Sequence, residues 1–414
     1  MTTLTTIRPP AADADWQAWM AYGLALAAAS PPHHAARPAP AWAPARATAG
    51  RTELALTLHA YREDRPGPRW QQLARATWPA YQRWFRSEGT AARPSYDDCR
   101  TALRHHLPEL VPTWERLTQL AMDATGASRD EAGRLLSLWC PTPFVTGCSQ
   151  VLVPGPDPAL IRSYDYDPAL FEGVIATTDY SGRRRVLGTS DCLWGLLDGI
   201  NDAGLAVSLT YGGRPGRGTG SVGPGFGIPL VIRYLLETCA DVPAAVAVLR
   251  RVPVAQAYNI GLVDTAGRHA TVFVAPGEDA EVSTQRIACN HRLDVVEHPH
   301  LAARLRSPER HAELTRLLAR GTDEAGLSDA FLRPPLRSRE YGAGFGSLYA
   351  VALRPGAGTV EYRWPGRTWT RRFDDPDEVI TVEVPHEPTG PGFGERHACR
   401  GRGRHPRPRH DADS

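Results

Sequence analysis

A thiol that follows a glycine, with an arginine and an aspartate shortly after it, has the composition of a nucleophilic site. Cys148 follows Gly147 in T-G-C-S-Q, and Arg162 and Asp165 stand in R-S-Y-D-Y-D. A thiolate is a strong nucleophile, and a neighbouring guanidinium favours it over the neutral thiol. A lone cysteine is more often a small buried apolar residue. These residues alone therefore leave catalysis and core packing both open.

The element that must position these side chains is a β-hairpin. Two short apolar runs, Val151–Val153 and Ala159–Ile161, flank the turn-forming residues P-G-P-D-P. Apolar runs separated by proline and glycine are typical of paired antiparallel strands. We expect the second strand to bring Arg162 and Asp165 back beside Cys148.

Three further candidates lie in the second half of the chain. Asn290 and His291 follow an expected strand at 286–289, and Arg310 lies one turn into a helix expected from Ser307. An asparagine amide can donate a hydrogen bond to a developing oxyanion. His291 is either a general base or a structural histidine, and Arg310 either reaches the site or pairs at the surface.

Other motifs predict structure rather than cofactor chemistry. The glycine-rich run Gly212–Gly227 lacks G-K-[ST], so it is not a phosphate-binding P-loop, and we expect a loop over the site. Asn201–Gly204 in D-G-I-N-D-A-G-L predicts a tight turn between strands. His298 and His300 have no evident third metal ligand. We therefore expect neither a metal nor an organic cofactor.

Apolar content, net charge and cysteine spacing limit the classes of protein to which the chain can belong. The 414 residues are 42% apolar and carry a net charge of +2, from 47 basic and 45 acidic residues, which favours neither nucleic acid nor an anionic membrane as partner. The seven cysteines show no C-x-x-C spacing, which suggests a reducing compartment. The apolar stretch Trp19–Ala29 is too short to span a bilayer and follows acidic residues. We expect a soluble, cytoplasmic protein.

Differences in composition and in hydrophobic periodicity divide the chain into four parts. Residues 1–51 are rich in proline and alanine and predict a disordered tail, and residues 386–414 predict a disordered basic tail. Residues 52–147 read as one strand followed by helices with an aromatic stripe at helical spacing, which we interpret as core. Residues 148–385 alternate strand blocks with helices, which predicts an α+β catalytic core.

Six motifs in order resemble a known family. They are T-G-C-S-Q, R-S-Y-D-Y-D, D-G-I-N-D-A-G-L, C-N-H-R, S-P-E-R and G-F-G-S-L-Y-A-V-A-L-R-P-G. From about Thr52 to Pro385 the chain resembles the autoproteolytic acyltransferase/hydrolase family typified by isopenicillin N acyltransferase, within the N-terminal nucleophile hydrolases. The bile-salt hydrolase and penicillin V acylase group is a more distant relative. The resemblance implies a four-layer αββα sandwich, here preceded by a mainly helical segment.

The resemblance also implies self-cleavage between Gly147 and Cys148. The thiol would attack the carbonyl of Gly147, and cutting would free the α-amine of Cys148, with a reference pKa of roughly 7.7–8.0. That amine can act as the general base for its own thiol. By matching positions, Cys148 is the nucleophile, Asp165 holds the α-amine or a bridging water, and Arg162 favours the thiolate.

The remaining matched positions imply roles in binding the oxyanion and in the polar network around the site. Asn290, with a backbone N–H, would bind the oxyanion, and Arg310 would complete the polar network. Tyr211 stands where the bile-salt group has a second oxyanion asparagine, so a backbone donor must serve instead. The chain also departs from the family's usual residues at Ser163, Cys289 and Ser347.

The resulting hypothesis is a self-cleaving cysteine amidohydrolase or acyltransferase. It would cleave or transfer an acyl group of a small amide or acyl donor through a thioester on Cys148, as a two-chain heterodimer derived from one polypeptide. One alternative is an uncleaved Cys–His hydrolase that uses His291. A second is a non-catalytic binding protein that keeps the fold.

Overall fold

The computed structural model describes residues 45–47, 53–144, 146–212, 223–292, 305–341 and 344–385. Both expected tails lie outside these residues, apart from the short strand β1 (Ala45–Ala47), which pairs with β2 (Glu53–Glu63). Residues 213–222 of the glycine-rich run, and His298 and His300, also lie outside them.

Two β-sheets form the centre of the molecule. The ten-stranded first sheet has the order β1-β2-β5-β6-β7-β8-β9-β10-β11, with β17 also paired to β2. Its further strands are β5 (Val174–Thr178), β6 (Val186–Asp191), β7 (Gly195–Asn201), β8 (Leu205–Tyr211), β9 (Tyr258–Asp264), β10 (His269–Val274), β11 (Glu281–Ser283) and β17 (Glu378–Pro385).

The seven-stranded second sheet contains the expected hairpin. Its order is β12-β3-β4-β14-β15-β16, with β13 paired to β14. The strands are β3 (Gly147–Val153), β4 (Ala159–Tyr166), β12 (Ile287–Ala288), β13 (Arg339–Glu340), β14 (Phe345–Arg354), β15 (Thr359–Trp364) and β16 (Arg367–Arg372). β3 and β4 pair antiparallel, so the hairpin prediction is confirmed.

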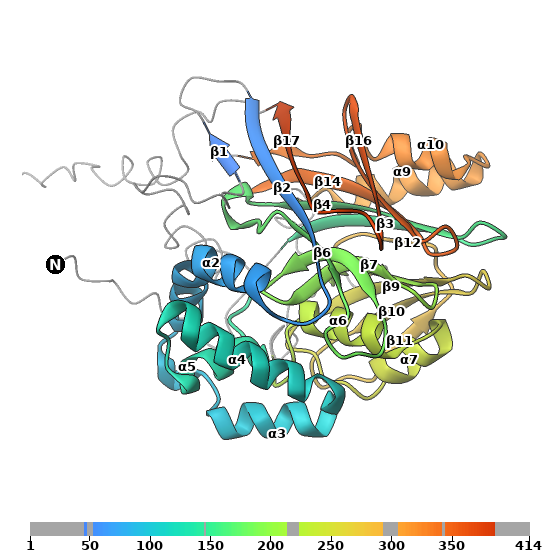
Figure 1. Cartoon of the computed structure of the whole chain (residues 1–414). Helices are drawn as coiled ribbons and strands as arrows, with labels where there is room; N and C mark the ends of the chain where they lie inside the picture. The colour runs from blue at the N-terminus through green and yellow to red at the C-terminus, as the bar shows by residue number, and fades with distance from the viewer. Residues whose placement is uncertain are drawn as a thin grey trace, which may run out of the picture.

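Helices cover the outer face of each sheet (Figure 1). α6 (Ile228–Thr238) and α7 (Val242–Leu249) pack on the first sheet, and α9 (Ser307–Ala319) and α10 (Glu324–Ala330) pack on the second. Strand alternation supplies a core on each face: Val351 and Leu353 of β14 lie between the sheets, and Ala350 and Ala352 face α9 and α10. The expected four-layer αββα sandwich is thus confirmed.

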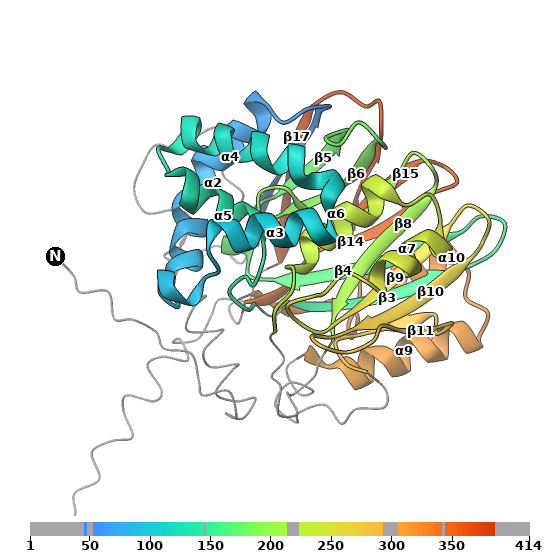
Figure 2. The same ribbon diagram turned by 90° about the horizontal axis from the view of Figure 1, so that it is seen from below.

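The aromatic stripe of the N-terminal segment is core, as expected. Its helices are α2 (Pro68–Arg86), α3 (Tyr96–His106), α4 (Val111–Thr125) and α5 (Arg129–Ser137). They lie on the same side as α6, away from α9 and α10 (Figures 1 and 2). Trp70 and Trp78 belong to the same apolar cluster as Leu235 of α6 and Val207 of β8. Because β2 is a strand of the first sheet, this segment is continuous with the sandwich.

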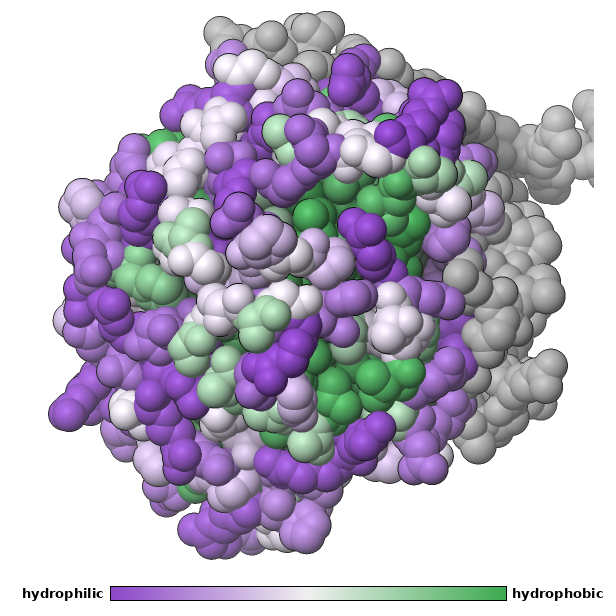
Figure 3. Space-filling view, turned by 90° about the vertical axis from the view of Figure 1, so that its right-hand side faces the viewer, coloured by the Kyte–Doolittle hydropathy of each residue, from purple (hydrophilic) through white to green (hydrophobic). Residues whose placement is uncertain are grey.

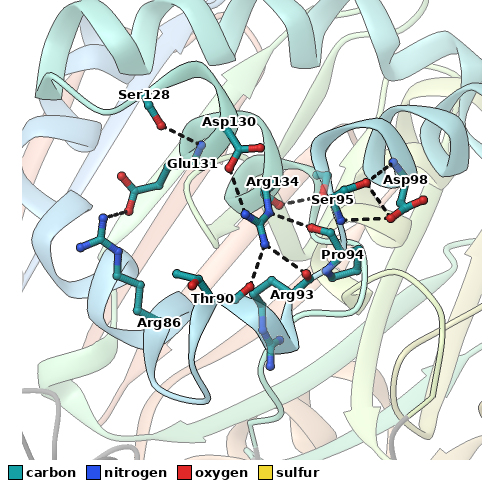
Figure 4. A network of polar contacts seen from close by, with 11 residues as sticks. Arg86, Thr90, Arg93, Pro94, Ser95, Asp98, Ser128, Asp130, Glu131 and Arg134 are labelled. Atoms are coloured by element: carbon teal, nitrogen blue, oxygen red, sulfur yellow. Dashed lines mark hydrogen bonds and ion pairs between the residues drawn. The ribbon is translucent and has the colours of Figure 1, made fainter.

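Polar contacts fix the ends of these helices (Figure 4). Arg134 of α5 donates hydrogen bonds to the carbonyl oxygens of Thr90, Arg93 and Pro94. The side chain of Ser95 caps α3, and that of Ser128 caps α5 by accepting from the N–H of Glu131. The loop before α3 is therefore held by the Arg134 side chain of α5.

The turn between β7 and β8 is structural, as the sequence predicted. Asn201 accepts hydrogen bonds from the N–H groups of Ala203 and Leu205, and Gly204 has a φ of +90°. The amide nitrogen of Asn201 donates to the carbonyl oxygens of Leu236 and Cys239 at the end of α6. Its polar atoms are thus all used within the fold.

Among the described residues, Val282 and Val379 are the exposed large apolar side chains. On the face seen in Figure 3, hydrophilic residues predominate, and apolar residues gather in two areas to the right of its centre. Within the described ranges, every helix is too short or too polar to span a lipid bilayer.

A glycine pair between β6 and β7 provides a test of this packing. Gly188 lies opposite Gly199, and a Cβ on Gly188 would collide with the carbonyl oxygen of Asp198. We expect Gly188→Ala to lower the free energy of unfolding by about 1–3 kcal/mol, measured by urea denaturation. Gly356→Ala is the matched control, since a Cβ there meets no atom within 4 Å. Equal stability of the two variants would contradict this packing.

Candidate active site

Cys148 lies at the start of β3, and its side chain points between the two sheets. It is 0% exposed and belongs to the core cluster between the sheets. Its register partner on β4 is Tyr164. The Sγ atom lies 3.2 Å from Nη2 of Arg162 and 3.8 Å from Oγ1 of Thr146. The structure therefore brings the predicted arginine into direct contact with the thiol.

Arg162 is held by a buried acidic partner from the other sheet. Its Nη1 atom forms an ion pair with Asp198 of β7, and both side chains are fully buried. The Tyr349 hydroxyl donates to Asp198 at 2.7 Å, and Thr189 Oγ1 donates to the same carboxylate at 2.7 Å. The guanidinium lies over the ring of Tyr164, 4.8 Å from its centroid. These contacts fix the position and direction of the charge that faces Cys148.

The thiol is subject to two opposing effects. Burial raises the pKa of Cys148 above its ordinary value, while the positive charge of Arg162 acts to lower it. Burial has the larger effect. In the uncut chain the thiol is therefore protonated at neutral pH, and its activation requires a base.

Asp165 lies on the opposite face of the hairpin, beside Gly147 rather than beside the thiol. Its carboxylate forms an ion pair with Arg310 of α9 and accepts a hydrogen bond from Ser347. Burial raises the pKa of Asp165, and the charge of Arg310 opposes that rise. Gly147 is the register partner of Asp165, and a Cβ on Gly147 would lie 3.1 Å from the Cβ of Asp165.

Arg310 connects Asp165 to β3. Its Nη1 atom lies 3.4 Å from Oγ of Ser149, the residue after Cys148. The side chain is 3% exposed, so it points into the protein rather than pairing at the surface. The two arginines thus approach the start of β3 from opposite faces.

Asn290 fixes the backbone nitrogen of the nucleophile. Its Oδ1 atom accepts a hydrogen bond of 2.9 Å from the N–H of Cys148. The other amide atom, Nδ2, is buried and has no hydrogen-bond partner among the described residues. Asn259 of β9 supports this position by donating to the carbonyl oxygens of Cys289 and His291 at 2.8 and 3.3 Å. Asn290 therefore retains a buried donor, while its other amide atom binds the backbone of Cys148.

His291 and Tyr211 lie in other surroundings than Arg162 and Asn290. Burial lowers the pKa of His291 to about 4, and its ring centroid lies 6.0 Å from that of His311. No hydrogen bond joins His291 to Cys148 in the described part of the chain. The Tyr211 ring packs on the helix-covered side of the first sheet, 6.2 Å from Tyr258, and its carbonyl accepts from Asn259.

Sequence reasoning missed Asp198, Asn259 and Tyr164. For Asp198 there is a signal: it is an acidic residue inside the apolar run L-L-D-G-I, where burial requires a partner. Neither Asn259 nor Tyr164 stands out from its neighbours. Among the described residues, no group of three histidine, cysteine, aspartate or glutamate side chains is arranged to hold a metal.

Replacing Arg162 tests the strength of its ion pair with Asp198 between the sheets. Arg162→Met leaves Asp198 buried without a cation, and we expect a loss of about 3–5 kcal/mol in the free energy of unfolding. Adding Asp198→Asn should recover part of that loss, because the unpaired charge is removed too. The measurement is a double-mutant cycle by urea denaturation. Strictly additive effects would show that the two residues do not interact.

The lowered pKa of His291 predicts a pH dependence of stability. The folded-state pKa of about 4 lies below the ordinary value of 6.5, so the contribution is complete above pH 6.5 and is lost as the pH falls toward 4. We expect the thermal midpoint of His291→Gln to fall less steeply over this window than that of the parent protein. His105→Gln, at an exposed position of α3, is the control. Parallel curves for all three proteins would contradict the buried position of His291.

Several solved structures are similar to the chain at low sequence identity. Solved structures similar to the chain include a Caenorhabditis elegans ortholog of N-acylethanolamine-hydrolyzing acid amidase (15% identity, 50% of this chain and 93% of that one, TM-score 0.37). Others are a mutant of conjugated bile acid hydrolase from Clostridium perfringens (11%, 57% and 96%, 0.35) and penicillin V acylase from Agrobacterium tumefaciens (14%, 52% and 82%, 0.34). No curated protein sequence matches the chain.

A family model matches residues 153–369. The match contains Arg162, Asp165, Asn290 and Arg310 and begins after Cys148, so it is shorter than the range expected from the motifs. It covers more than half of the 414 residues, and the chain therefore belongs to the acyl-coenzyme A:6-aminopenicillanic acid acyl-transferase family.

Proposed function

We propose that this protein is a self-cleaving cysteine amidohydrolase or acyltransferase that works through an acyl-thioester on Cys148. The observation that carries the proposal is the contact between the buried thiol and Arg162, directly after Gly147. Family membership supports acyl transfer as the type of reaction. The substrate is a small amide or acyl donor.

Self-cleavage begins with attack of the Cys148 sulfur on the carbonyl carbon of Gly147. The C–N bond then breaks, the nitrogen of Cys148 leaves as an amine with the proton from the thiol, and a thioester remains. Water hydrolyses the thioester to give the carboxylate of Gly147 and the free thiol. The close approach of Asp165 and Leu305 to Gly147, where a Cβ would lie 3.1 and 3.4 Å from their side chains, supports a requirement for glycine there.

After cutting, the same nitrogen becomes the general base. In the uncut chain it is already bound by Oδ1 of Asn290, an acceptor that suits an amine equally well. The amine takes the proton from the thiol, and the thiolate, favoured by Arg162, attacks the substrate carbonyl. The unpartnered Nδ2–H group of Asn290 is suited to bind the oxyanion.

The second half of the reaction transfers the acyl group. The α-ammonium gives its proton to the leaving amine, which departs and leaves the acyl-thioester. Water or an acceptor amine then attacks the thioester and regenerates the thiolate. The uncleaved hydrolase with His291 as base is not supported, because that ring has no contact with the thiol among the described residues.

We also propose that the N-terminal segment stays bound after cutting, as the smaller chain of a heterodimer. Its aromatic residues share one core with the first sheet. Trp70 Nε1 donates to the carbonyl oxygen of Leu193, and Trp194 Nε1 donates to that of Leu136, each at 2.8 Å. Loss of the segment would expose this apolar surface to water.

Cys148→Ala tests the cleavage step. We expect the parent protein to yield two fragments, one ending at Gly147 and one beginning at Cys148, and the variant to remain one chain, because the sulfur nucleophile is gone. Intact mass and N-terminal sequencing provide the measurement. Cys99→Ala, at another buried cysteine in α3, should be cut like the parent. An uncut parent protein, or a cut Cys148→Ala protein, would refute the proposal.

A further inference from the structure

The chain that carries the Gly147–Cys148 bond passes from one face of the first sheet to the other. Phe144 lies with the N-terminal helices, and its ring centroid is 6.4 Å from that of Trp84 in α2. Four residues later, Cys148 belongs to the core between the two sheets. At such a crossing the backbone leaves the hydrogen-bond ladders of the sheets, so its polar groups need other partners.

Gln256 supplies these partners on the helix-covered side. Its Oε1 atom accepts a hydrogen bond of 3.3 Å from the N–H of Phe144, and its Nε2 atom donates one of 3.2 Å to the carbonyl oxygen of the same residue. The hydroxyl of Tyr258 also donates to Oε1, at 3.3 Å. Gln256 is 4% exposed. One buried side-chain amide thus binds both backbone groups of Phe144, as a neighbouring strand would.

Asn259, three residues after Gln256, acts on the other side of the cleavage point. Its Nδ2 atom donates to the carbonyl oxygens of Cys289 and His291, the residues before and after Asn290. Asn290 in turn accepts the hydrogen bond from the N–H of the nucleophile. Asn259 therefore reaches the amine side of the scissile bond through Asn290.

Thr210 of β8 shares this contact. Its hydroxyl donates to the carbonyl oxygen of Cys289 at 2.9 Å and accepts from Nδ2 of Asn259 at 3.1 Å. Thr210 and Asn259 are register partners, so their side chains lie on the same face of the first sheet. The strand before Asn290, β12, has only two residues. The position of Asn290 therefore depends on these two side chains of the first sheet.

On the basis of the proposed self-cleavage, we propose that Gln256 and Asn259 are positioning residues that fix the two sides of the scissile bond. Gln256 fixes the acyl side through Phe144, and Asn259 fixes the amine side through Asn290. Attack of the Cys148 sulfur on the preceding carbonyl carbon requires a narrow range of backbone geometry, and contacts on both sides keep the chain within it. Neither side chain has to touch the reacting atoms.

The rate of self-cleavage in the full chain tests this proposal. Gln256→Met removes both amide atoms at similar side-chain length, Asn259→Ala removes the donor, and Thr210→Val replaces the hydroxyl with a methyl group. We expect each change to lower the first-order rate constant for cutting on the order of 10-fold, because the bond spends less time in the reactive geometry. The chain is made by cell-free translation, translation is stopped, and intact mass gives the fraction cut with time.

Two matched variants serve as controls. Thr210→Ser keeps the hydroxyl, and Gln119→Met changes an exposed glutamine of α4 whose amide binds Asp123. Both should be cut within about twofold of the parent rate. Each substitution is also placed in the Cys148→Ala chain, which lacks the nucleophile, and its unfolding by urea is measured. A residue that serves only the fold would lower the midpoint, while the folded molecules would be cut at the parent rate.

The outcomes separate this inference from the proposed function. If the parent is cut but folded Gln256→Met or Asn259→Ala protein is cut equally fast, the positioning role is wrong and the proposed function stands. Equal slowing in Thr210→Ser and Thr210→Val would also overturn it. Where Gln256→Met or Asn259→Ala does not fold, Gln256→Glu, which lacks the donor, and the Thr210 pair give the decision by the same criterion. A parent chain that is never cut would refute both.

Discussion

The ion pair between Arg162 and Asp198 is the interaction on which the site depends. It joins β4 of the second sheet to β7 of the first, in a region closed to water. Two charges are stable in such a place only when they are paired and their remaining hydrogen-bonding atoms are satisfied. Tyr349 and Thr189 meet that requirement for the carboxylate. Since the same guanidinium also reaches the sulfur of Cys148, one contact sets both the alignment of the sheets and the electrostatics of the thiol.

The parts of this arrangement that are local in sequence could be predicted from it. The β3–β4 hairpin follows from two apolar runs and a proline-rich turn, and the cap residues Ser95 and Ser128 follow from their spacing to the next acidic residue. The position of Arg162 beside Cys148 also follows, because both lie on one hairpin. These features depend on neighbours within about twenty residues, where turn chemistry and side-chain alternation are decisive.

The contacts that complete the site are distant in sequence. Asn290 reaches the backbone of Cys148 across 142 residues, and Asp198 reaches Arg162 from a different sheet. Residue type suggested a role for Asn290, but nothing in the sequence indicates which strand Asp198 faces. The face on which Asp165 lies follows from alternation along β4, which places it with Gly147 and Arg310 rather than with the sulfur. Strand alternation predicts this result, because Arg162 and Asp165 are three residues apart and so lie on opposite faces of β4.

The N-terminal helices bind the first sheet at the turn between β6 and β7. Trp70 and Tyr81 of α2 hold the turn between β6 and β7 by binding the backbone of Leu193 and Cys192. The hydroxyl of Tyr81 also binds Glu172, so α2 is tied to the loop before β5 as well. The sandwich supplies the reacting groups, and the helices fix a turn of its first sheet.

The shared core of these helices and the first sheet has a consequence for how the molecule comes apart. While the backbone is continuous, unfolding is a unimolecular process, and its midpoint is independent of dilution. If the peptide bond before Cys148 is hydrolysed, the same apolar contact becomes an association between two molecules. Heat or denaturant would then act on an equilibrium that obeys mass action, so a dilute sample would melt at a lower temperature than a concentrated one.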